Sequence, residues 1–365
     1  MIRVGYFSPF VPPEWIAAHG ACPEWLTLDG TASHAFNATH RGVCPCAGAI
    51  AARTMDDFAL DAMVLTTACD QMRYAAAYLD TVGKIPVFLL NVPSTWQSLQ
   101  VRQLYREELE RLGRFLTEIG GREPRGGELE SIILGYDQRR SAALEARAKV
   151  SARQWQETLV GLRSDPLGLA PHQPKAGQAR NPTFMNMSAP CAEVANKDSK
   201  TRARMEAAGP TSSRALQTGI PLALVGGPLM TEDRSFLAML EQVGGRIVLD
   251  ASEGGERTLP ATVDGRRLRE DPLEELVRIY FDSIPDVFRR PNSHLYEWLG
   301  EHLKAHAVRG IILRRYLFCD LWHAESHRLR QWSEVPVLDM DVIAGDEGES
   351  RRVLGRIEAF LEMLR

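Results

Sequence analysis

The sequence IILRRYLFCDLWHAESHRLRQWSEVPVLDMDV, residues 311–342, decides the fold class of this chain. Its apolar first residues predict a short buried strand. Cys319 and Asp320 follow; an aspartate can cap a helix, and apolar side chains then recur at helical spacing over residues 321–332. A second apolar strand is predicted at residues 335–340. This order of strand, helix and strand indicates an open α/β sheet, in which ligands bind at the carboxyl ends of the strands.

An earlier stretch repeats this arrangement. Residues 61–66, DAMVLT, predict a strand, and residues 71–83, QMRYAAAYLDTVG, predict a helix. Cys69 and Asp70 stand between them, and a further strand is predicted at residues 85–90. A free cysteine is often only a small buried hydrophobic residue. Two equivalent Cys-Asp corners, each after a strand, are harder to explain by packing alone and favour a shared function.

Strands and helices alternate along most of the chain, which predicts doubly wound, mainly parallel sheets. We expect an N-terminal α/β domain at residues 1–100 and a C-terminal α/β domain at residues 216–365, with a helical insert and an irregular linker at residues 101–215 between them. The insert carries strongly amphipathic helical patterns. The linker, from residue 164, is rich in Pro, Gly, Ser, Asn and Lys without a clear period. Residues 29–42, which are polar and rich in Gly, Ser, Thr and His, predict a loop.

The composition is that of an ordinary soluble globular protein: 365 residues with 44% hydrophobic and 25% charged side chains. The chain is long enough for two or three domains with their own cores. A formal net charge of −4 gives no electrostatic reason to expect nucleic acid or an anionic membrane as a partner. No apolar run approaches the roughly 18 residues of a membrane span, and the N-terminus lacks the pattern of a secretory signal. We therefore expect a cytoplasmic protein.

The chain has six cysteines, at positions 22, 44, 46, 69, 191 and 319. In a reducing compartment so few cysteines are not expected to form a disulfide framework. Thiolates also bind zinc, iron–sulfur clusters and copper. The nearest pair, Cys44-Pro-Cys46, has neither the spacing of a zinc finger nor that of a ferredoxin, so a metal site would need distant loops to converge. Cys22, in an apolar run, is interpreted as a buried residue, and Cys191, in the linker, as an incidental one.

Three further patterns have both a structural and a functional interpretation. The glycines at 226 and 227 follow a predicted strand but lack the GxGxxG pattern of a phosphate-binding loop, so a turn is favoured. The arginines at 314 and 315 are interpreted first as charge at the end of a strand, and second as a grip for an anionic substrate. His323 and His327 lie four residues apart, as zinc ligands can, but without a Glu-His pair of the usual kind a solvated pair is favoured.

The chain resembles the subunits of 2-hydroxyacyl-CoA dehydratases and benzoyl-CoA reductases, the dehydratase D-component family, over nearly its whole length. The opening, GYFSPFVPPEWIAAHGACPEWL at residues 5–26, is similar to the family's opening strand and helix. VCPCAGAIA (43–51), TTACDQMR (66–73) and YLFCD (316–320) resemble its three cysteine segments, and GRIEAFLEML (355–364) resembles its closing helix. Each motif is modest, but all of them occur in the family's order at suitable distances.

The resemblance implies that cysteines from three distant loops hold a [4Fe–4S] cluster. Cys69 and Cys319 correspond directly to two of the family's ligands. The third corresponds to Cys44, but Cys46 occupies a position where family members usually have an aromatic residue. Either cysteine could therefore be the ligand, or Cys46 could supply a further thiolate.

The resemblance also implies a reaction and its partners. With three protein thiolates, one iron of the cluster stays open to a substrate thioester carbonyl or a small ligand. One low-potential electron then makes a ketyl radical of the acyl-CoA, which expels the 2-hydroxyl group in dehydratases or begins ring reduction in benzoyl-CoA reductases. An ATP-hydrolysing activator with its own cluster supplies the electron, and a homologous second subunit completes a hetero- or homodimer.

Two other functions stay open at this point. The chain could be an electron-transfer or accessory subunit that holds a [4Fe–4S] cluster without a substrate site. It could instead be a non-catalytic scaffold subunit without a cluster, in which the thiols of Cys44, Cys69 and Cys319 are only buried. Turnover of an acyl-CoA indicates the enzyme, a reducible cluster without turnover indicates the electron carrier, and absence of iron indicates the scaffold.

Overall fold

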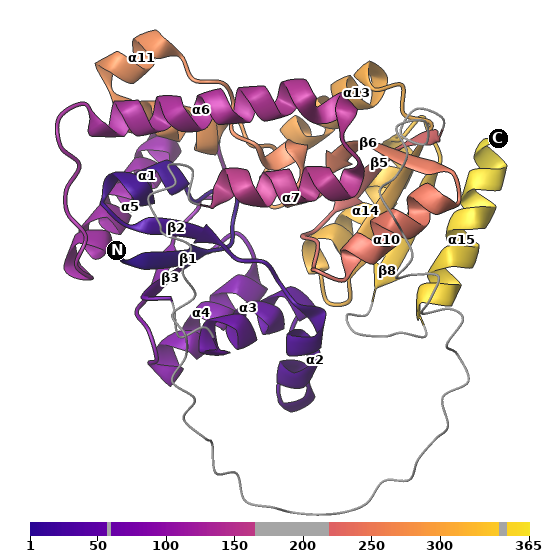
Figure 1. Ribbon diagram of the computed structural model, residues 1–365, viewed down its shortest axis with the longest axis horizontal. Helices are drawn as coiled ribbons and strands as arrows, with labels where there is room; N and C mark the ends of the chain where they lie inside the picture. The colour runs from indigo at the N-terminus through magenta and orange to yellow at the C-terminus, as the bar shows by residue number, and fades with distance from the viewer. Residues whose placement is uncertain (57–59, 165–218, 343–348) are drawn as a thin grey trace, which may run out of the picture.

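The computed structural model describes residues 1–56, 60–164, 219–342 and 349–365. Two parallel sheets of four strands each form its framework (Figure 1). The first has the order β2-β1-β3-β4, and its strands are β1 Arg3–Tyr6, β2 Cys22–Trp25, β3 Ala62–Thr66 and β4 Val87–Leu90. The second has the order β6-β5-β7-β8, and its strands are β5 Ile220–Gly226, β6 Gly245–Ala251, β7 Gly310–Tyr316 and β8 Val337–Val342. The predicted architecture of two mainly parallel α/β sheets is confirmed, and the two sheets share one strand order.

One central strand of each sheet is buried along its whole length because helices surround the sheet. Every residue of β3, whose sequence is AMVLT, and every residue of β7 is buried. Strands of parallel sheets read as continuous apolar runs, since neither face meets water. The helices of the first sheet are α1 Pro13–Ala18, α2 Gly30–Thr39, α3 Pro45–Asp56 and α4 Asp70–Val82. Those of the second are α10 Asp233–Gln242, α13 Ser293–Ala305, α14 Asp320–Trp332 and α15 Glu349–Leu364.

Most of residues 29–42, for which the sequence predicted a loop, are helical. Helix α2 begins after Asp29, whose carboxylate accepts hydrogen bonds from the backbone N–H groups of Thr31 and Ala32 at 2.8 and 3.1 Å. The buried ring of Phe36 packs against α4. The loop prediction was wrong because this N-cap and this contact outweigh the low helix propensity of the Gly, Ser, Thr and Asn residues.

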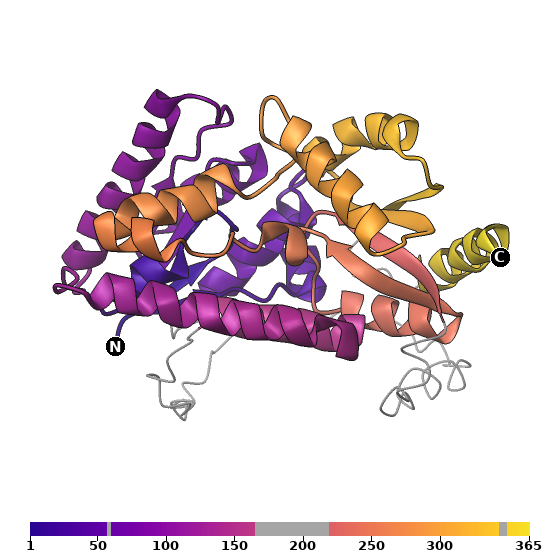
Figure 2. The same cartoon turned by 90° about the horizontal axis from the view of Figure 1, so that it is seen from above.

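Three helices link the two sheets: α5 Leu99–Glu118, α6 Glu128–Ala146 and α7 Ala152–Arg163. Helix α7 contacts β2 of the first sheet and β6 of the second. Figure 2 shows α6, in magenta, extended along one side of the molecule. None of the helices in the described part of the chain is long and apolar enough to cross a membrane. The predicted irregular linker falls almost entirely on residues 165–218, which lie outside the described residues. The division into domains at residues 1–100, 101–215 and 216–365 therefore stays a prediction.

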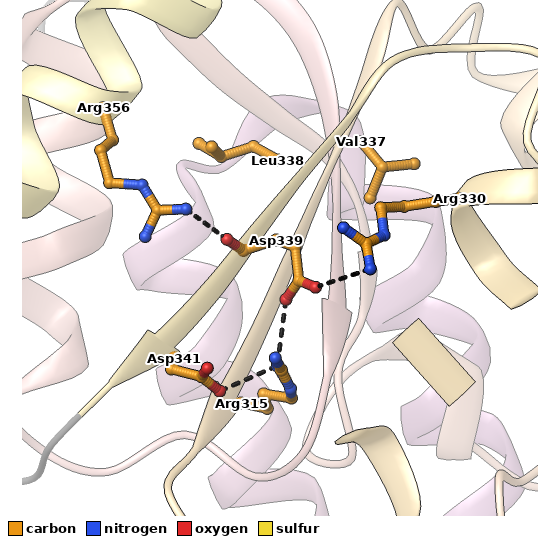
Figure 3. A pocket seen from close by; sticks show the side chains of 7 residues that line it. All are labelled: Arg315, Arg330, Val337, Leu338, Asp339, Asp341 and Arg356. Atoms are coloured by element: carbon orange, nitrogen blue, oxygen red, sulfur yellow. Dashed lines mark hydrogen bonds and ion pairs between the residues drawn. The ribbon is translucent and has the colours of Figure 1, made fainter. Parts of the chain in front are cut away.

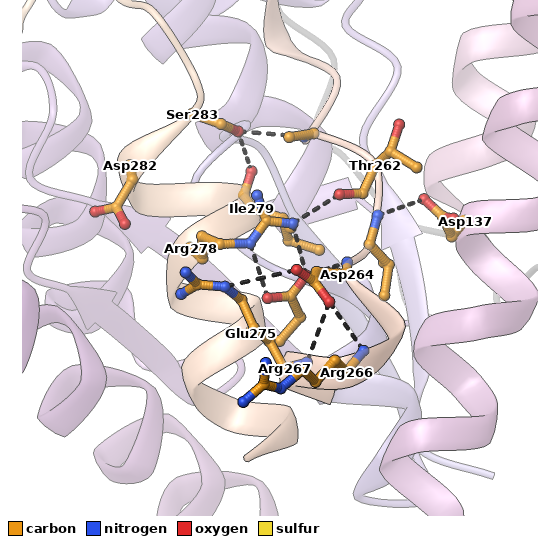
Figure 4. A network of polar contacts seen from close by, with 12 residues as sticks. Asp137, Thr262, Asp264, Arg266, Arg267, Glu275, Arg278, Ile279, Asp282 and Ser283 are labelled. Carbon is orange, nitrogen blue, oxygen red and sulfur yellow. Dashed lines mark hydrogen bonds and ion pairs between the residues drawn. The ribbon is translucent and has the colours of Figure 1, made fainter. Parts of the chain in front are cut away.

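A polar network fixes the segment by which the chain returns from β6 to the helices around the first sheet (Figure 4). The buried carboxylate of Glu275 accepts hydrogen bonds from the backbone N–H of Asp264 at 2.6 Å and from the Arg278 guanidinium at 2.6 and 2.8 Å. Arg278 also donates to the carbonyl of Thr262 at 2.7 Å. The short helices held in this way are α11 Gly265–Glu270, α12 Pro272–Leu276 and the π-helix η3 Val277–Asp282.

A buried ion pair joins the first domain to the helical insert and to η3. Glu14 of α1 is fully buried, and its carboxylate accepts hydrogen bonds from Arg140 of α6 at 2.5 Å and from the hydroxyl of Tyr280 at 2.7 Å. A carboxylate in the protein interior needs such partners because burying it without them is costly. The three elements are therefore held in one arrangement.

Replacing Arg140 by Met should destabilise the fold strongly, because the Glu14 carboxylate would lose its ionic partner while staying buried. Breaking a buried pair from one side costs about 3–5 kcal/mol. The matched control is Arg153→Met, which removes an exposed pair with Glu157 at 3.4 Å, and it should cost less than about 1 kcal/mol. Chemical denaturation of both variants measures the difference, and equal free energies of unfolding would contradict this account of the ion pair.

Candidate functional site

Three of the predicted cysteines lie directly before helices. Cys69 is the N-cap residue of α4, Cys319 is the N-cap residue of α14, and Cys44 immediately precedes α3. Cys69 and Cys319 follow β3 and β7, which hold equivalent places in the two sheets. An aspartate begins each of these two helices, where the helix dipole favours negative charge. The predicted Cys-Asp corners are therefore strand-to-helix turns at the carboxyl ends of equivalent strands.

The four thiols at positions 44, 46, 69 and 319 are close enough to influence one another's ionisation. Burial raises the pKa of the Cys319 thiol, and the charges of Cys44 and Cys69 raise it further. Burial raises the pKa of Cys69 to about 11, and Cys44 again contributes. Burial also raises the pKa of Cys46, with contributions from Cys44 and Cys319. The tertiary structure thus brings together the four cysteines that the sequence singled out.

Cys44 differs from the other three thiols because its pKa is lowered. The main cause is a hydrogen bond with the Cys46 side chain; burial opposes it, and the backbone N–H groups of Cys46 and Ala47 add to it. Cys46, in the first turn of α3, is only 2% exposed, and burial raises its pKa, with the interaction with Cys44 acting in the same direction. Cys44 is therefore the more thiolate-like of the pair and the better candidate for a metal ligand.

Backbone N–H groups at the helix starts favour the thiolate form of the other two sulfurs as well. The N–H groups of Gln71 and Met72 lower the pKa of Cys69, and that of Trp322 lowers the pKa of Cys319, in both cases against the larger effect of burial. Helix N-termini carry partial positive charge and bind anions. Three such N-termini converge here, and they offset part of the cost of burying anionic sulfur.

The other cysteines and the histidine pair do not join this group. Cys22 is buried in β2, as expected, and Cys191 lies outside the described residues. His323 and His327 are both exposed on α14. Within residues 1–56, 60–164, 219–342 and 349–365, no three His, Cys, Asp or Glu side chains are arranged to hold a single metal ion.

The arginines at 314 and 315 are both buried in ion pairs. Arg314 pairs with Asp233. Arg315 lies between Asp339 at 3.0 Å and Asp341 at 2.8 Å, beside a cavity of about 400 Å³ along β8 (Figure 3). Since carboxylates compensate both charges, the arrangement favours the structural interpretation of this pair over a grip for an anionic substrate.

Two residues near the thiols were missed by sequence analysis. Gly227 follows β5, and a side chain there would begin 3.8 Å from the sulfur of Cys319. The carbonyl of Gly227 accepts a hydrogen bond from the backbone N–H of Glu253 at 3.2 Å, and Glu253 follows β6. The turn at 226–227 was predicted, but its contact with Cys319 was not. The only sequence signal for Glu253 is an acidic residue shortly after a predicted parallel strand.

Glu253 is an acidic group with an unusual environment. Burial raises its pKa to about 7, and the nearby charge of Asp286 raises it further. In return, Glu253 raises the pKa of three of the thiols. The residue is partly exposed, and no hydrogen bond or ion pair from the described residues reaches its carboxyl group.

The Glu253→Gln variant of the metal-free chain should be more stable than the wild type above pH 7. The folded chain keeps the Glu253 proton up to a pKa of about 7, whereas the unfolded chain releases it near 4.5. The free energy of unfolding of the wild type therefore falls by up to about 3 kcal/mol as pH rises between these values. The variant has no proton to release at this position and should not show this fall. Denaturation at pH 5 and pH 8 measures the effect, with Glu107→Gln on the exposed face of α5 as the control. A gain that is equal at both pH values would contradict this explanation.

The sequence model of the family described as 2-hydroxyglutaryl-CoA dehydratase, D-component, matches residues 9–364, nearly the whole chain. The match contains the three helix starts and all four thiols of the site. No curated protein matches the chain. The resemblance inferred from the sequence is confirmed: the chain belongs to the 2-hydroxyglutaryl-CoA dehydratase D-component family.

Proposed function

We propose that the chain is the cluster-bearing subunit of a 2-hydroxyacyl-CoA dehydratase, with a [4Fe–4S] cluster held by Cys44, Cys69 and Cys319. The observation that carries the proposal is the convergence of these three thiols, each at the start of a helix. Membership of the dehydratase family over residues 9–364 supports an acyl-CoA thioester as the substrate.

The donor set suits such a cluster better than a single ion. Thiolates are the usual ligands of iron–sulfur clusters, and each binds a different iron, so the sulfurs are spread around the cluster. A zinc ion instead needs all of its thiolates about 2.3 Å from one centre. Three helix N-termini and the lowered pKa of Cys44 favour thiolate ligands.

Cys46 is assigned a supporting role in this proposal. The interaction between the two thiols lowers the pKa of Cys44 and raises that of Cys46, which is almost completely buried. Hydrogen bonds to ligand sulfurs tune the reduction potential of an iron–sulfur cluster. Cys44 is therefore proposed as the third ligand, and Cys46 as the neighbour that adjusts it.

When bound, the cluster would be held by Cys44, Cys69 and Cys319 and would supply low-potential one-electron chemistry for an acyl-CoA thioester. The chain's own contribution is to hold the three sulfurs and to leave room beside them. Gly227 leaves that room, because any side chain there would begin 3.8 Å from the sulfur of Cys319. An ATP-hydrolysing activator with its own cluster and a homologous second subunit complete the proposed enzyme, as in the rest of the family.

Iron and acid-labile sulfide analysis after anaerobic purification tests the ligand set. The wild type should contain about four irons per chain. Cys44→Ser, Cys69→Ser and Cys319→Ser should each lose iron or hold it unstably. Cys46→Ser is the matched control: serine keeps a hydrogen-bond donor, so this variant should retain its iron and change only the reduction potential.

The opposite results would be equally informative. Full iron in the Cys69 and Cys319 variants would disprove the ligand assignment, and loss in Cys46→Ser but not in Cys44→Ser would make Cys46 the third ligand. With the partner subunit, activator and ATP, turnover of a 2-hydroxyacyl-CoA is expected. A reducible cluster without turnover would indicate an electron carrier, and a wild type without iron after reconstitution would indicate a scaffold.

A further inference from the structure

A carboxyl group without a partner stands beside the thiols of the proposed cluster site. The backbone N–H of Glu253 donates to the carbonyl of Gly227, the residue next to the Cys319 sulfur. The carbonyl of Glu253 accepts a hydrogen bond from the Thr258 hydroxyl at 2.7 Å. The main chain of Glu253 is therefore fixed on both sides, while its carboxyl group is bonded to none of the residues that the structure describes.

The neighbouring acidic residues of the same loop have partners. Asp250 accepts hydrogen bonds from a glutamine side chain and from a backbone N–H group. Glu256 accepts one from Arg147 at 2.6 Å. A partly exposed carboxyl group without a protein partner is free to meet a ligand, and ionisable groups in such environments are concentrated at functional sites. Glu253 thus differs from its neighbours in the way expected of a group that meets a ligand.

We propose that Glu253 contacts the substrate, and that its carboxyl group hydrogen-bonds the 2-hydroxyl group of the acyl-CoA; this rests on the proposed function above. The hydroxyl-bearing carbon is bonded directly to the thioester carbonyl carbon. A carbonyl that binds among the thiols therefore brings the hydroxyl close to Gly227, which lies beside the Cys319 sulfur and whose carbonyl accepts a hydrogen bond from the backbone of Glu253.

Of the polar groups of a 2-hydroxyacyl-CoA, the 2-hydroxyl group is the partner that best suits the carboxyl group of Glu253. A carboxylate repels the phosphates of CoA, whereas a carboxyl or carboxylate oxygen accepts a hydrogen bond from a hydroxyl. A site built to bind a substrate hydroxyl rejects an analogue that lacks it, because the protein group is then left unpaired. Glu253 should therefore determine the preference for 2-hydroxyacyl over plain acyl thioesters.

Calorimetric titration of the cluster-loaded protein with its partner subunit, under anaerobic conditions, tests this role. The probes are 2-hydroxyglutaryl-CoA against glutaryl-CoA and lactyl-CoA against propionyl-CoA. The wild type should bind the hydroxylated member of at least one pair roughly tenfold more tightly, the effect of about one hydrogen bond. Glu253→Ala should abolish that preference, and Glu253→Gln, which keeps hydrogen-bonding atoms, should restore part of it.

Glu256→Gln is the matched control, because it changes an acid of the same loop whose carboxylate pairs with Arg147. It should keep the wild-type preference. An unchanged preference in Glu253→Ala, or equal binding of both members of each pair by the wild type, would overturn the proposal. Loss of iron from Glu253→Gln would also overturn it and would make Glu253 a ligand of the cluster. If the wild type itself contained no iron, the proposed function would be disproved, and this result would be known from iron analysis before any thioester is tested.

Discussion

The buried carboxylate of Glu14 is the constraint on which the arrangement of this chain depends. Arg140 and Tyr280 share it, and they belong to helices that are far apart in the sequence. Since a buried charge that loses its partner costs several kcal/mol, α1, α6 and η3 separate only at that cost. Helix α7 adds a second link because it contacts strands of both sheets. These links hold the sheets in one relative position, and in that position the strand-to-helix corners of both halves of the chain meet.

Two opposing effects act on the thiols at this meeting point. Burial favours the neutral thiol, and it prevails at Cys69 and Cys319, whose pKa values are raised. Helix N-termini favour the thiolate, and at Cys44 the added hydrogen bond with Cys46 makes this effect prevail and lowers its pKa. Such a balance suits a positively charged group that binds thiolates, because ligation offsets the cost of burying them. The proposed cluster is a group of this kind.

The site also has two chemically different sides. The thiols are soft ligands for metal, whereas Glu253 offers a hydrogen-bonding carboxyl group from the turn after β6. Gly227 lies between them: its carbonyl binds the backbone of Glu253, and its missing side chain leaves space beside Cys319. A substrate with a carbonyl and a hydroxyl on adjacent carbons matches this pairing. The same strand order in both sheets places these groups at the carboxyl ends of strands, where open α/β sheets bind ligands.

The sequence by itself determined the strands, most helices, the Cys-Asp corners and the family, because these depend on neighbouring residues or on motif order. It did not determine α2, whose stability depends on the cap by Asp29 and on a contact of Phe36 with another helix. It could not decide whether Cys44 or Cys46 is the third ligand, and no pattern in it distinguished Glu253 from the other acidic residues. The tertiary structure decided the first of these points, and for the other two it supplies the contacts on which the proposals rest. Burial, the thiol hydrogen bond and the missing partner of a carboxyl group all depend on loops from distant parts of the chain, and no local pattern records which of those loops meet.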